Sequence, residues 1–474
     1  MKVKEFIKTI ILTVLIISSL VLSSKIWFSK ELWPDGYNSF NYAKNWNLFG
    51  LFSGSDNKAL SLSQIFSPKQ TYISKDEKNI LVLPANSRSE ALNTLLKGYL
   101  KDAVSKGEVE ETKDEEFKKA TASSFIFLDF YNYISFEMLA DYYGVDVKGD
   151  ISDISNVKHI LFNLYDAETL YIYAKNNKSG DSYRIKLTAD LKELNSLCDD
   201  ILKKVNKDTV SSSFAFENNF DKKADGEDSK LLLDSFMLIN LETSSLKNIE
   251  PVPLYDRNDS AYSQISKNFD IANTSARRFT DTSGTVNFVE NFATLKFHNS
   301  GLLEYNSLNQ NEGVKLKGNF NSDYDVVKLV GEFTEKLNSN FNLPDKNNYV
   351  FSGVKEDDDK YTVYFDILYD GVPVIIKDRD NEAFSHAIEA VFYGGRIISY
   401  KQILCGFTDN GSESEMQPMI SALDEFYATY DTKSNSDLVI NDIYNIYHFD
   451  IKTGMAELKN AVSLSNKEVV IVKP

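Results

Sequence analysis

Four histidines are the residues that could most readily supply acid–base or metal chemistry: His159, His298, His386 and His448. None of them has a second ligand at the spacing of a helical zinc site such as H-E-x-x-H. The chain also lacks a G-x-S-x-G nucleophile turn, a glycine-rich phosphate loop and a C-x-x-C pair. We therefore expect each histidine in a strand, and we predict no catalytic residue, no cofactor-binding residue and no metal ligand.

Two acidic stretches could hold a cation or form a carboxylate site. Residues 356–359 read Glu-Asp-Asp-Asp, but they lack the spacing of an EF-hand loop and its glycine at the sixth position. Asp281 is followed closely by Ser283 and Gly284, which are residues that also form turns. We expect a hairpin tip at the first stretch and a turn at the second. The lack of an assembled catalytic motif favours a binding protein over an enzyme. A catalytic site of carboxylates that come together only in the folded chain is the alternative.

The two cysteines, Cys198 and Cys405, are too few for a secreted fold stapled by disulfides. Cys198 lies on the apolar side of a helix predicted over 190–204, so we expect it to be buried. We predict no bond between the two thiols, because it would join different domains.

The first thirty residues decide where the rest of the chain resides. Residues 9–24 contain no charge and lie between Lys8 and Lys25. At about 1.5 Å per residue a helix over this run spans about 24 Å, and apolar neighbours extend it towards a hydrocarbon core of about 30 Å. We predict a retained transmembrane helix. A cleaved signal peptide is the alternative, and the small residues Ser23 and Ser24 fit it.

The flanks of the run predict its orientation. Lysines precede it, which favours a cytoplasmic amino end, and tryptophans follow it, as in an outer aromatic belt. Residues 31–474 would then be extracellular. The predicted anchors at the two membrane interfaces are Lys8, Lys25, Trp27 and Trp33.

One face of the predicted membrane helix carries small hydroxyl side chains. At 100° per residue these residues and the aliphatic ones between them fall within about 140°. Small residues let membrane helices approach closely, so we predict an interface with a partner's membrane helix, with a chance distribution as the alternative. The face consists of Thr9, Thr13, Ile16, Ser19, Leu20 and Ser23.

Composition excludes some classes of partner. The 474 residues carry a net charge of −17, and the first thirty contain five lysines and one glutamate. The remainder therefore carries −21. Such an acidic body argues against nucleic acid and against lying flat on anionic lipid. Aromatic residues make up 13% of the chain and are mostly Phe and Tyr, which is typical of β-rich packing.

Changes in composition and periodicity divide the chain into five predicted segments. These are a cytoplasmic tip and membrane helix (1–30), a juxtamembrane linker (31–59), an N-terminal α+β domain (60–205), a linker with a middle α+β domain (206–320) and a C-terminal α+β domain (321–474). The predicted fold class is α+β, with one N-terminal transmembrane helix followed by extracellular domains of antiparallel sheets with packed helices.

Periodicity predicts the elements of the first domain. A helix follows the capping box Ser87–Glu90, and the acidic stretch 107–119 is expected as an exposed turn or helix. The predicted strands cover 124–134, 159–164, 170–174 and 183–187.

The last domain has the clearest pattern. Asp323 is expected to cap a helix, and hairpins are expected around Asp370-Gly371 and Gly394-Gly395. A second helix is predicted over 420–430, followed by strands near 438–449, 455–464 and 468–472.

Several stretches resemble the YycH (WalH) family. The opening IKTIILTVLIISSLVLSSKIW resembles the family's membrane segment, and residues 277–305 resemble its middle segment. YTVYFDILYDGVPVI (361–375) and AIEAVFYGGRIISYKQI (387–403) resemble the domain that the family shares with YycI proteins. No single one of these motifs is diagnostic, and none is catalytic.

The resemblance implies a single-pass membrane protein without a cofactor that regulates cell-wall metabolism in Gram-positive bacteria. Its partners would be the WalK/YycG sensor histidine kinase and a YycI-like membrane protein, contacted through the membrane helix and the extracellular domains. The alternative is an extracellular binding module for a cell-wall, peptide or lipid ligand, with the helix as a tether. The two differ in whether an unrelated membrane helix in place of residues 6–28 preserves function.

Overall fold

The computed structural model describes residues 65–472 apart from internal gaps. The gaps are 77, 83–86, 144–150, 152–153, 165–167, 177–179, 204–211, 223–230, 241–243, 272–275, 378–384, 433–434, 436 and 467. The predicted membrane helix with its partner face and anchors, and the linker 31–59, lie outside the described residues. Among the helices that are described, none combines the length and apolar character needed to cross a bilayer.

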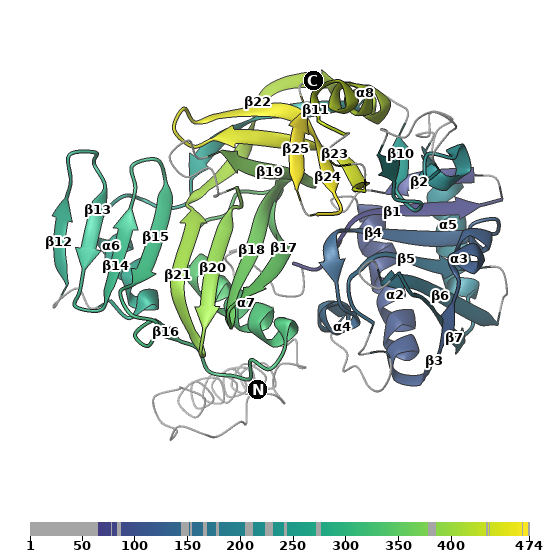
Figure 1. The fold of residues 1–474 in the computed structure, drawn as a ribbon, viewed down its shortest axis with the longest axis horizontal. Coiled ribbons are helices and arrows are strands. Elements are labelled where there is room, and N and C mark those ends of the chain that lie inside the picture. Colours follow the sequence, from purple (N-terminus) through teal and green to yellow (C-terminus); the bar gives the residue numbers. More distant parts are fainter. Residues whose placement is uncertain are drawn as a thin grey trace, which may run out of the picture. The chain divides into compact units, whose positions relative to one another are not determined.

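A seven-stranded antiparallel sheet forms the N-terminal part of the described chain (Figure 1). In spatial order its strands are β2 (Lys78–Val82), β1 (Pro68–Lys75), β4 (Phe125–Ile134), β5 (Val157–Asn163), β6 (Thr169–Asn176), β7 (Ser182–Thr188) and β3 (Glu108–Thr112). Its helices are α2 (Ser87–Lys106), α3 (Asp114–Ala120), α4 (Phe136–Tyr143) and α5 (Lys192–Lys203).

The central strands of this sheet are buried on both faces, which explains their nearly continuous apolar sequence. Ile126 and Leu128 of β4 pack in the same core as Leu92 and Leu96 of α2. Phe127, which points to the other face, packs in a separate aromatic core. That second core includes residues from α3 and from a small sheet of β8 (Ser212–Phe214) and β10 (Leu238–Asn240).

A larger sheet joins the later strands of the chain. Its main path is β12 (Arg277–Thr280), β13 (Val286–Val289), β14 (Ala293–Phe297), β15 (Leu302–Ser307), β21 (Arg396–Ile403), β20 (Ile388–Tyr393), β18 (Lys360–Tyr369), β19 (Val372–Lys377), β23 (Val439–Asp450), β24 (Met455–Leu464) and β25 (Val469–Val472). Off this path, β16 (Val314–Lys315) pairs with β21, β17 (Asn347–Asp357) with β18, and β9 (Leu232–Leu233) with β23.

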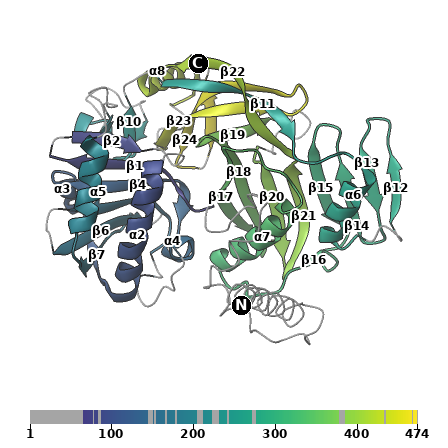
Figure 2. The same cartoon turned by 180° about the vertical axis from the view of Figure 1, so that it is seen from behind.

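The remaining elements connect or cover these strands. They are the paired strands β11 (Ser244–Pro253) and β22 (Cys405–Met416), the 3₁₀ turns η5 (Ala215–Asn218) and η6 (Lys267–Phe269), and the helices α6 (Asp259–Ser266), α7 (Asp323–Asn338) and α8 (Met419–Thr429). Figure 2 shows α6 and α7 on one side of the strands β13–β21. Ring contacts between Phe333 of α7 and Tyr400, and between Phe269 and Tyr305, place both helical segments on the same sheet face.

The described residues confirm an α+β fold in which most strand pairs are antiparallel. Two pairs depart from this pattern, because β23 runs parallel to both β19 and β9. The boundaries predicted at 205 and 320 stay predictions. The structure does show that β12–β15, from the predicted middle segment, share a sheet with β18–β25 from the last segment.

The predicted hairpins of the last segment are confirmed. Asp370 and Gly371 have φ values of 49° and 81°, and Gly394 and Gly395 have 53° and 81°. Two successive positive φ angles define the type I′ turn, whose twist matches that of antiparallel strands. These four residues therefore fix the register of β18 with β19 and of β20 with β21.

One local prediction was wrong and another held only in part. The cap of α7 is Ser322, whose hydroxyl accepts a hydrogen bond from the amide of Asp325, and Asp323 is the first helical residue. The acidic stretch 107–119 contains the predicted helix as α3, but its first half forms the strand β3. Its single aromatic residue, Phe117, is fully buried against Phe236, so one apolar side chain anchors an otherwise charged surface.

Candidate functional site: a buried charge cluster

Strand pairing brings polar side chains together inside the N-terminal sheet. Gln70 of β1 lies opposite Asp129 of β4, which lies opposite His159 of β5. Lys69 and Lys158 are the neighbours of this row in sequence. The register is irregular at Lys69 and at Lys158, and neither lysine is paired across to β4. Both lysines therefore lie beside the row, and charged groups from three strands meet there.

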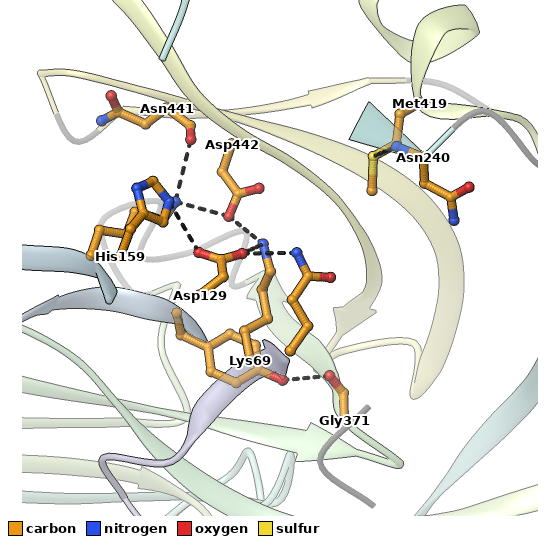
Figure 3. A network of polar contacts seen from close by, with 11 residues as sticks. Lys69, Asp129, His159, Asn240, Gly371, Met419, Asn441 and Asp442 are labelled. Atoms are coloured by element: carbon orange, nitrogen blue, oxygen red, sulfur yellow. Dashed lines mark hydrogen bonds and ion pairs between the residues drawn. The ribbon is translucent and has the colours of Figure 1, made fainter. Parts of the chain in front are cut away.

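The cluster is completed by Asp442 from β23, which is 373 residues away from Lys69 in sequence. Lys69 Nζ lies 2.8 Å from Asp129 Oδ2 and 2.6 Å from Asp442 Oδ2. Lys158 Nζ lies 2.9 Å from the same oxygen of Asp442. Figure 3 shows the carboxylates of Asp129 and Asp442 turned toward Lys69. Two ammonium groups and two carboxylates therefore balance each other.

These groups are almost completely removed from solvent. The exposed fraction is 5% for the side chains of both Lys158 and Asp129 and 7% for that of Asp442. Desolvating a charge costs several kcal/mol, and only excellent geometry with further hydrogen bonds offsets it. Here Gln70 Nε2 donates to Asp129 Oδ2 at 2.9 Å. The cluster is stable as a complete set, and removal of one member leaves a buried charge unpaired.

The protonation states follow from these contacts. Burial acts to raise the pKa of Asp129, but the charge of Lys69, the neighbouring His159 and the charge of Lys158 outweigh burial, so this pKa is strongly lowered. Burial acts to lower the pKa of Lys158, but the charges of Asp442 and Asp129 outweigh it, and this pKa is raised. Both residues are therefore charged at neutral pH.

His159 adds a fifth titratable group to the cluster. Its Nε2 lies 3.3 Å from Asp129 Oδ1, and its ring stacks on Phe127 with 5.2 Å between the centroids. The other ring nitrogen, Nδ1, is buried and has no hydrogen-bond partner among the described residues.

Three consecutive residues of β4 extend the connection between the two sheets. The Tyr131 hydroxyl donates to the carbonyl of Gly371 at 2.5 Å. The Asn132 amide donates to the Ser352 hydroxyl at 3.4 Å, and Asn441 Nδ2 donates to the Tyr133 hydroxyl at 2.8 Å. The end of β4 thus contacts the β18–β19 turn, β17 and β23 in turn.

A serine, an aspartate and a histidine meet beside this connection, but their geometry differs from a nucleophilic triad. His386 Nδ1 lies 2.8 Å from Asp366 Oδ1 and 3.3 Å from the Ser352 hydroxyl, which itself donates to Asp366 Oδ2 at 2.5 Å. A triad needs the carboxylate and the hydroxyl on opposite ring nitrogens. Here both lie on the same nitrogen, so the arrangement orients the imidazole without forming a base for Ser352.

The residues singled out in the sequence lie apart from this cluster, except for His159. Cys198 and Cys405 are not bonded to each other and Cys198 is buried, both as predicted; Cys405 is buried as well, and burial raises the pKa of each thiol to about 12. Asp281 forms the predicted turn by accepting hydrogen bonds from the amides of Ser283 and Thr285. Within the described ranges, no group of three potential ligands is placed to hold a metal ion.

Of the four histidines, His159 and His448 lie in strands as predicted. The other two, His298 and His386, flank strand ends instead.

Sequence reasoning missed the charge cluster, although a signal for it was present. Asp129 is the only charged residue in the apolar strand FIFLDFYNYI, and Asp442 interrupts VINDIY in the same way. Charged side chains are seldom fully buried unless they are paired. A lone charge within a strand that is apolar on both sides therefore predicts a buried partner, without saying which residue it is.

The chain is similar to known proteins in both sequence and fold. Residues 5–206 match the family model described as the N-terminal domain of the YycH protein. The search of curated proteins gave no match. Among solved structures, the crystal structure of YycH from Bacillus subtilis is similar, with a TM-score of 0.60 and 15% sequence identity. The similarity covers 88% of this chain and 98% of that one.

The two findings complement each other. The sequence match covers the N-terminal sheet together with the apolar run ahead of it, and the structural match extends over most of the chain. The chain is thus similar to YycH proteins in the sequence of its N-terminal domain and in its fold.

Proposed function

We propose that the chain is a membrane-anchored extracellular regulator of a cell-wall-related two-component sensor kinase of the WalK/YycG type. The observation that carries this proposal is the YycH family match, which begins at residue 5 and so includes the apolar run. The proposed topology is a single pass with a cytoplasmic amino end. No catalytic step belongs to the proposal.

The proposed mechanism is contact with the kinase and with a YycI-like partner. In the membrane, the face that runs from Thr9 to Ser23 packs on a partner helix. Outside it, the two sheets make further contacts. The regulator then shifts the kinase between signalling states only as far as these contacts differ in strength between the states.

The charge cluster suits a protein that acts in this way. β1 is the first described strand after the proposed membrane segment, and its Lys69 is bound by Asp442 in the last third of the chain. A partner that binds the later strands is thus coupled to β1 through buried ion pairs. If only a flexible segment joined β1 to the later strands, binding of a partner to those strands would affect β1 much less.

Co-purification from detergent-solubilised membranes tests the function. We expect the full chain to recover a sensor kinase and a second single-pass protein. Recovery of neither would contradict the proposal and favour a tethered binding module.

The membrane face has its own test in a bacterial two-hybrid assay. We expect Thr13→Leu combined with Ser19→Leu to weaken the signal with the partner's membrane helix. Ser18→Leu is the matched control, because Ser18 lies on the opposite side of the predicted helix. An unchanged signal for the double variant would remove the helix face from the proposal.

Replacing the membrane segment distinguishes a regulator that acts through its membrane helix from a tethered binding module. An unrelated membrane helix in place of residues 6–28 should abolish regulation while the protein is still exported. Full regulation by this chimaera would show that the native helix serves only as a tether.

A further inference from the structure

The larger sheet ends at β12, and the outer edge of this strand has no neighbouring strand. Within the described residues β12 pairs only with β13, and Figure 1 and Figure 2 show it at the end of the sheet. All four of its residues are exposed, and neither a proline nor a bulge interrupts Arg277–Thr280. A free strand edge of this kind is a template for pairing with another chain. The residues on the edge therefore determine which chain fits.

Three residues at alternate positions of this edge share the open face of the sheet. Asn287 of β13 lies opposite Phe279, and its amide donates to Asp281 Oδ2 at 3.4 Å, so both side chains are on its face. Arg277 precedes Phe279 by two residues and points the same way, because successive strand residues alternate between faces. Arg278 points to the other face, where its guanidinium contacts a ring of α6.

The backbone groups of the edge alternate as well. The amide of Asp281 donates to the carbonyl of Thr285, just before β13, at 3.0 Å, so the pairing with β13 extends to Asp281. In an antiparallel pair every second residue exchanges hydrogen bonds with the same neighbour, so the groups of Phe279 also face β13. The amides and carbonyls of Arg278 and Thr280 therefore point to the outer edge, where an added strand would bond to them.

A second copy of the same edge fits these groups in one antiparallel register. Setting Arg278 opposite Thr280 of the second copy, and the reverse, joins the outward amides and carbonyls of both strands. The same register sets Phe279 opposite Phe279, and Arg277 opposite Asp281 twice. These are the non-hydrogen-bonded positions, at which Cα atoms lie about 4.5 Å apart and side chains come closest. The two-fold axis is normal to the sheet, so all these side chains stay on the open face.

The charges on the edge suit this pairing. The Arg277 guanidinium has no carboxylate partner among the described residues, and its carbon lies 5.8 Å from the Phe279 ring. Asp281 is exposed. Its Oδ1 accepts the hydrogen bonds that close the turn, whereas its Oδ2 accepts only the 3.4 Å bond from Asn287 within the described chain. Oδ2 is therefore available to the arginine of a second copy.

We propose that β12 pairs with β12 of a second copy of this chain, with Phe279 facing Phe279 and Arg277 facing Asp281. The two ion pairs select the register, because a shift by two residues separates both of them. Exposed ion pairs contribute little each, and the strand is short. The inference therefore rests on the proposed function, because membrane anchoring raises the effective concentration at which two copies meet.

Disulfide cross-linking of the full chain in cell membranes tests the register. We expect Phe279→Cys to cross-link to itself after mild oxidation with copper phenanthroline, because the two substituted side chains meet at the two-fold axis. Met455→Cys is the control, since Met455 is 58% exposed and lies on β24, outside the edge. Cys198 and Cys405 are buried, so the native thiols should give no background.

Charge reversal in the Phe279→Cys background tests the ion pairs. Arg277→Glu alone sets like charges opposite each other at two positions, and Asp281→Lys alone does the same. Each should lower the cross-linked fraction about tenfold. When the two variants are expressed together with different affinity tags, the mixed dimer regains opposite charges at both positions. Cross-linking between the two tags should therefore return, and its return also shows that both variants fold.

A milder variant separates the charge from the turn. Asp281→Asn keeps the Oδ1 atom that accepts from the amides of Ser283 and Thr285 and removes only the charge. We expect it to lower the cross-linked fraction about threefold. Circular dichroism of the purified variant checks its fold.

Each outcome decides the proposal. Cross-linking of Phe279→Cys that is no stronger than that of Met455→Cys overturns it. An unchanged cross-linked fraction in Asp281→Asn, or no recovery in the mixed dimer, overturns it as well. If the expected pattern appears but no kinase co-purifies, the edge contact stands and the proposed function fails. Recovery of the kinase without the cross-link has the opposite meaning.

Discussion

At the scale of single residues, the charges buried at Lys69, Asp129, Lys158 and Asp442 are the feature with the largest energetic consequence. Isolated buried ions are costly, and the four are tolerated because each faces at least one opposite charge within 2.9 Å. Asp442 is the member that touches both lysines, so its loss affects the whole cluster.

Replacing Asp442 with asparagine should therefore be strongly destabilising. The change leaves two ammonium groups facing one carboxylate, and breaking a buried pair in this way costs about 3–5 kcal/mol. Urea unfolding followed by circular dichroism measures the loss. Asp102→Asn is the matched control: Asp102 pairs with Lys106 on the surface of α2, with side-chain exposures of 51% and 69%. We expect the control to change stability by no more than about 0.5 kcal/mol.

His386 should make stability depend on pH near neutrality. Burial acts to lower its pKa, but the charge of Asp366, the hydrogen bond to it and the charge of Glu389 outweigh burial, so the pKa is raised. A histidine whose pKa is higher in the folded state contributes its full stabilisation below its unfolded pKa of about 6.5. This stabilisation is lost as the pH rises through the folded pKa. The advantage of the unmodified chain over His386→Gln should shrink from about pH 5 to pH 8.

His448 is a control for which the change of stability with pH should have the opposite sign. Burial, together with Lys459 and Lys377, lowers its pKa, so its charged form is disfavoured in the folded state. The stability of the unmodified chain relative to His448→Gln should therefore improve as pH rises over the same range. Parallel pH profiles for the two variants would contradict the assignment of His386.

At the scale of elements, the ends of helices and hairpins are set by short-range chemistry. The turns at Asp370-Gly371 and Gly394-Gly395 were predictable because few residues adopt two positive φ angles in succession. The start of α7 was missed by one residue. Either Ser322 or Asp323 can cap a helix by type, and the choice depends on which one takes the extended conformation that Ser322 has here.

Ser322→Ala tests this cap. The change removes the acceptor for the amide of Asp325, and loss of such a cap costs about 0.5–2 kcal/mol. Ser105→Ala is the control, because the Ser105 hydroxyl donates only to the carbonyls of Lys101 and Asp102 within α2. Thermal unfolding should distinguish the two variants. An equal, small effect of both would mean that another group satisfies the Asp325 amide.

At the scale of the whole described chain, one apolar core runs through both large sheets. It includes Leu96 of α2, Ile160 of β5 and Phe365 of β18. Phe66 and Phe351 add a ring contact with 5.6 Å between centroids. The charge cluster and the hydrogen bonds of β4 lie in the same connection, so the two sheets should not unfold independently.

We expect calorimetry to show one cooperative transition for the unmodified chain. Asp442→Asn combined with Tyr131→Phe removes the central carboxylate and the hydrogen bond to Gly371. The calorimetric enthalpy of this double variant should then exceed its van't Hoff enthalpy, which is the sign of separate transitions. Asp102→Asn should keep the single transition. Two transitions in the unmodified chain would show that the sheets are uncoupled from the start.

The sequence by itself determined the local features of this protein: the uncharged run at 9–24, the strands of the first domain and the hairpin turns. Periodicity and turn chemistry act over a few residues, so they can be read directly. Only the tertiary structure decided that Lys69 meets Asp442 and that β15 pairs with β21. Those contacts depend on strand order and register between distant segments, which no local pattern encodes.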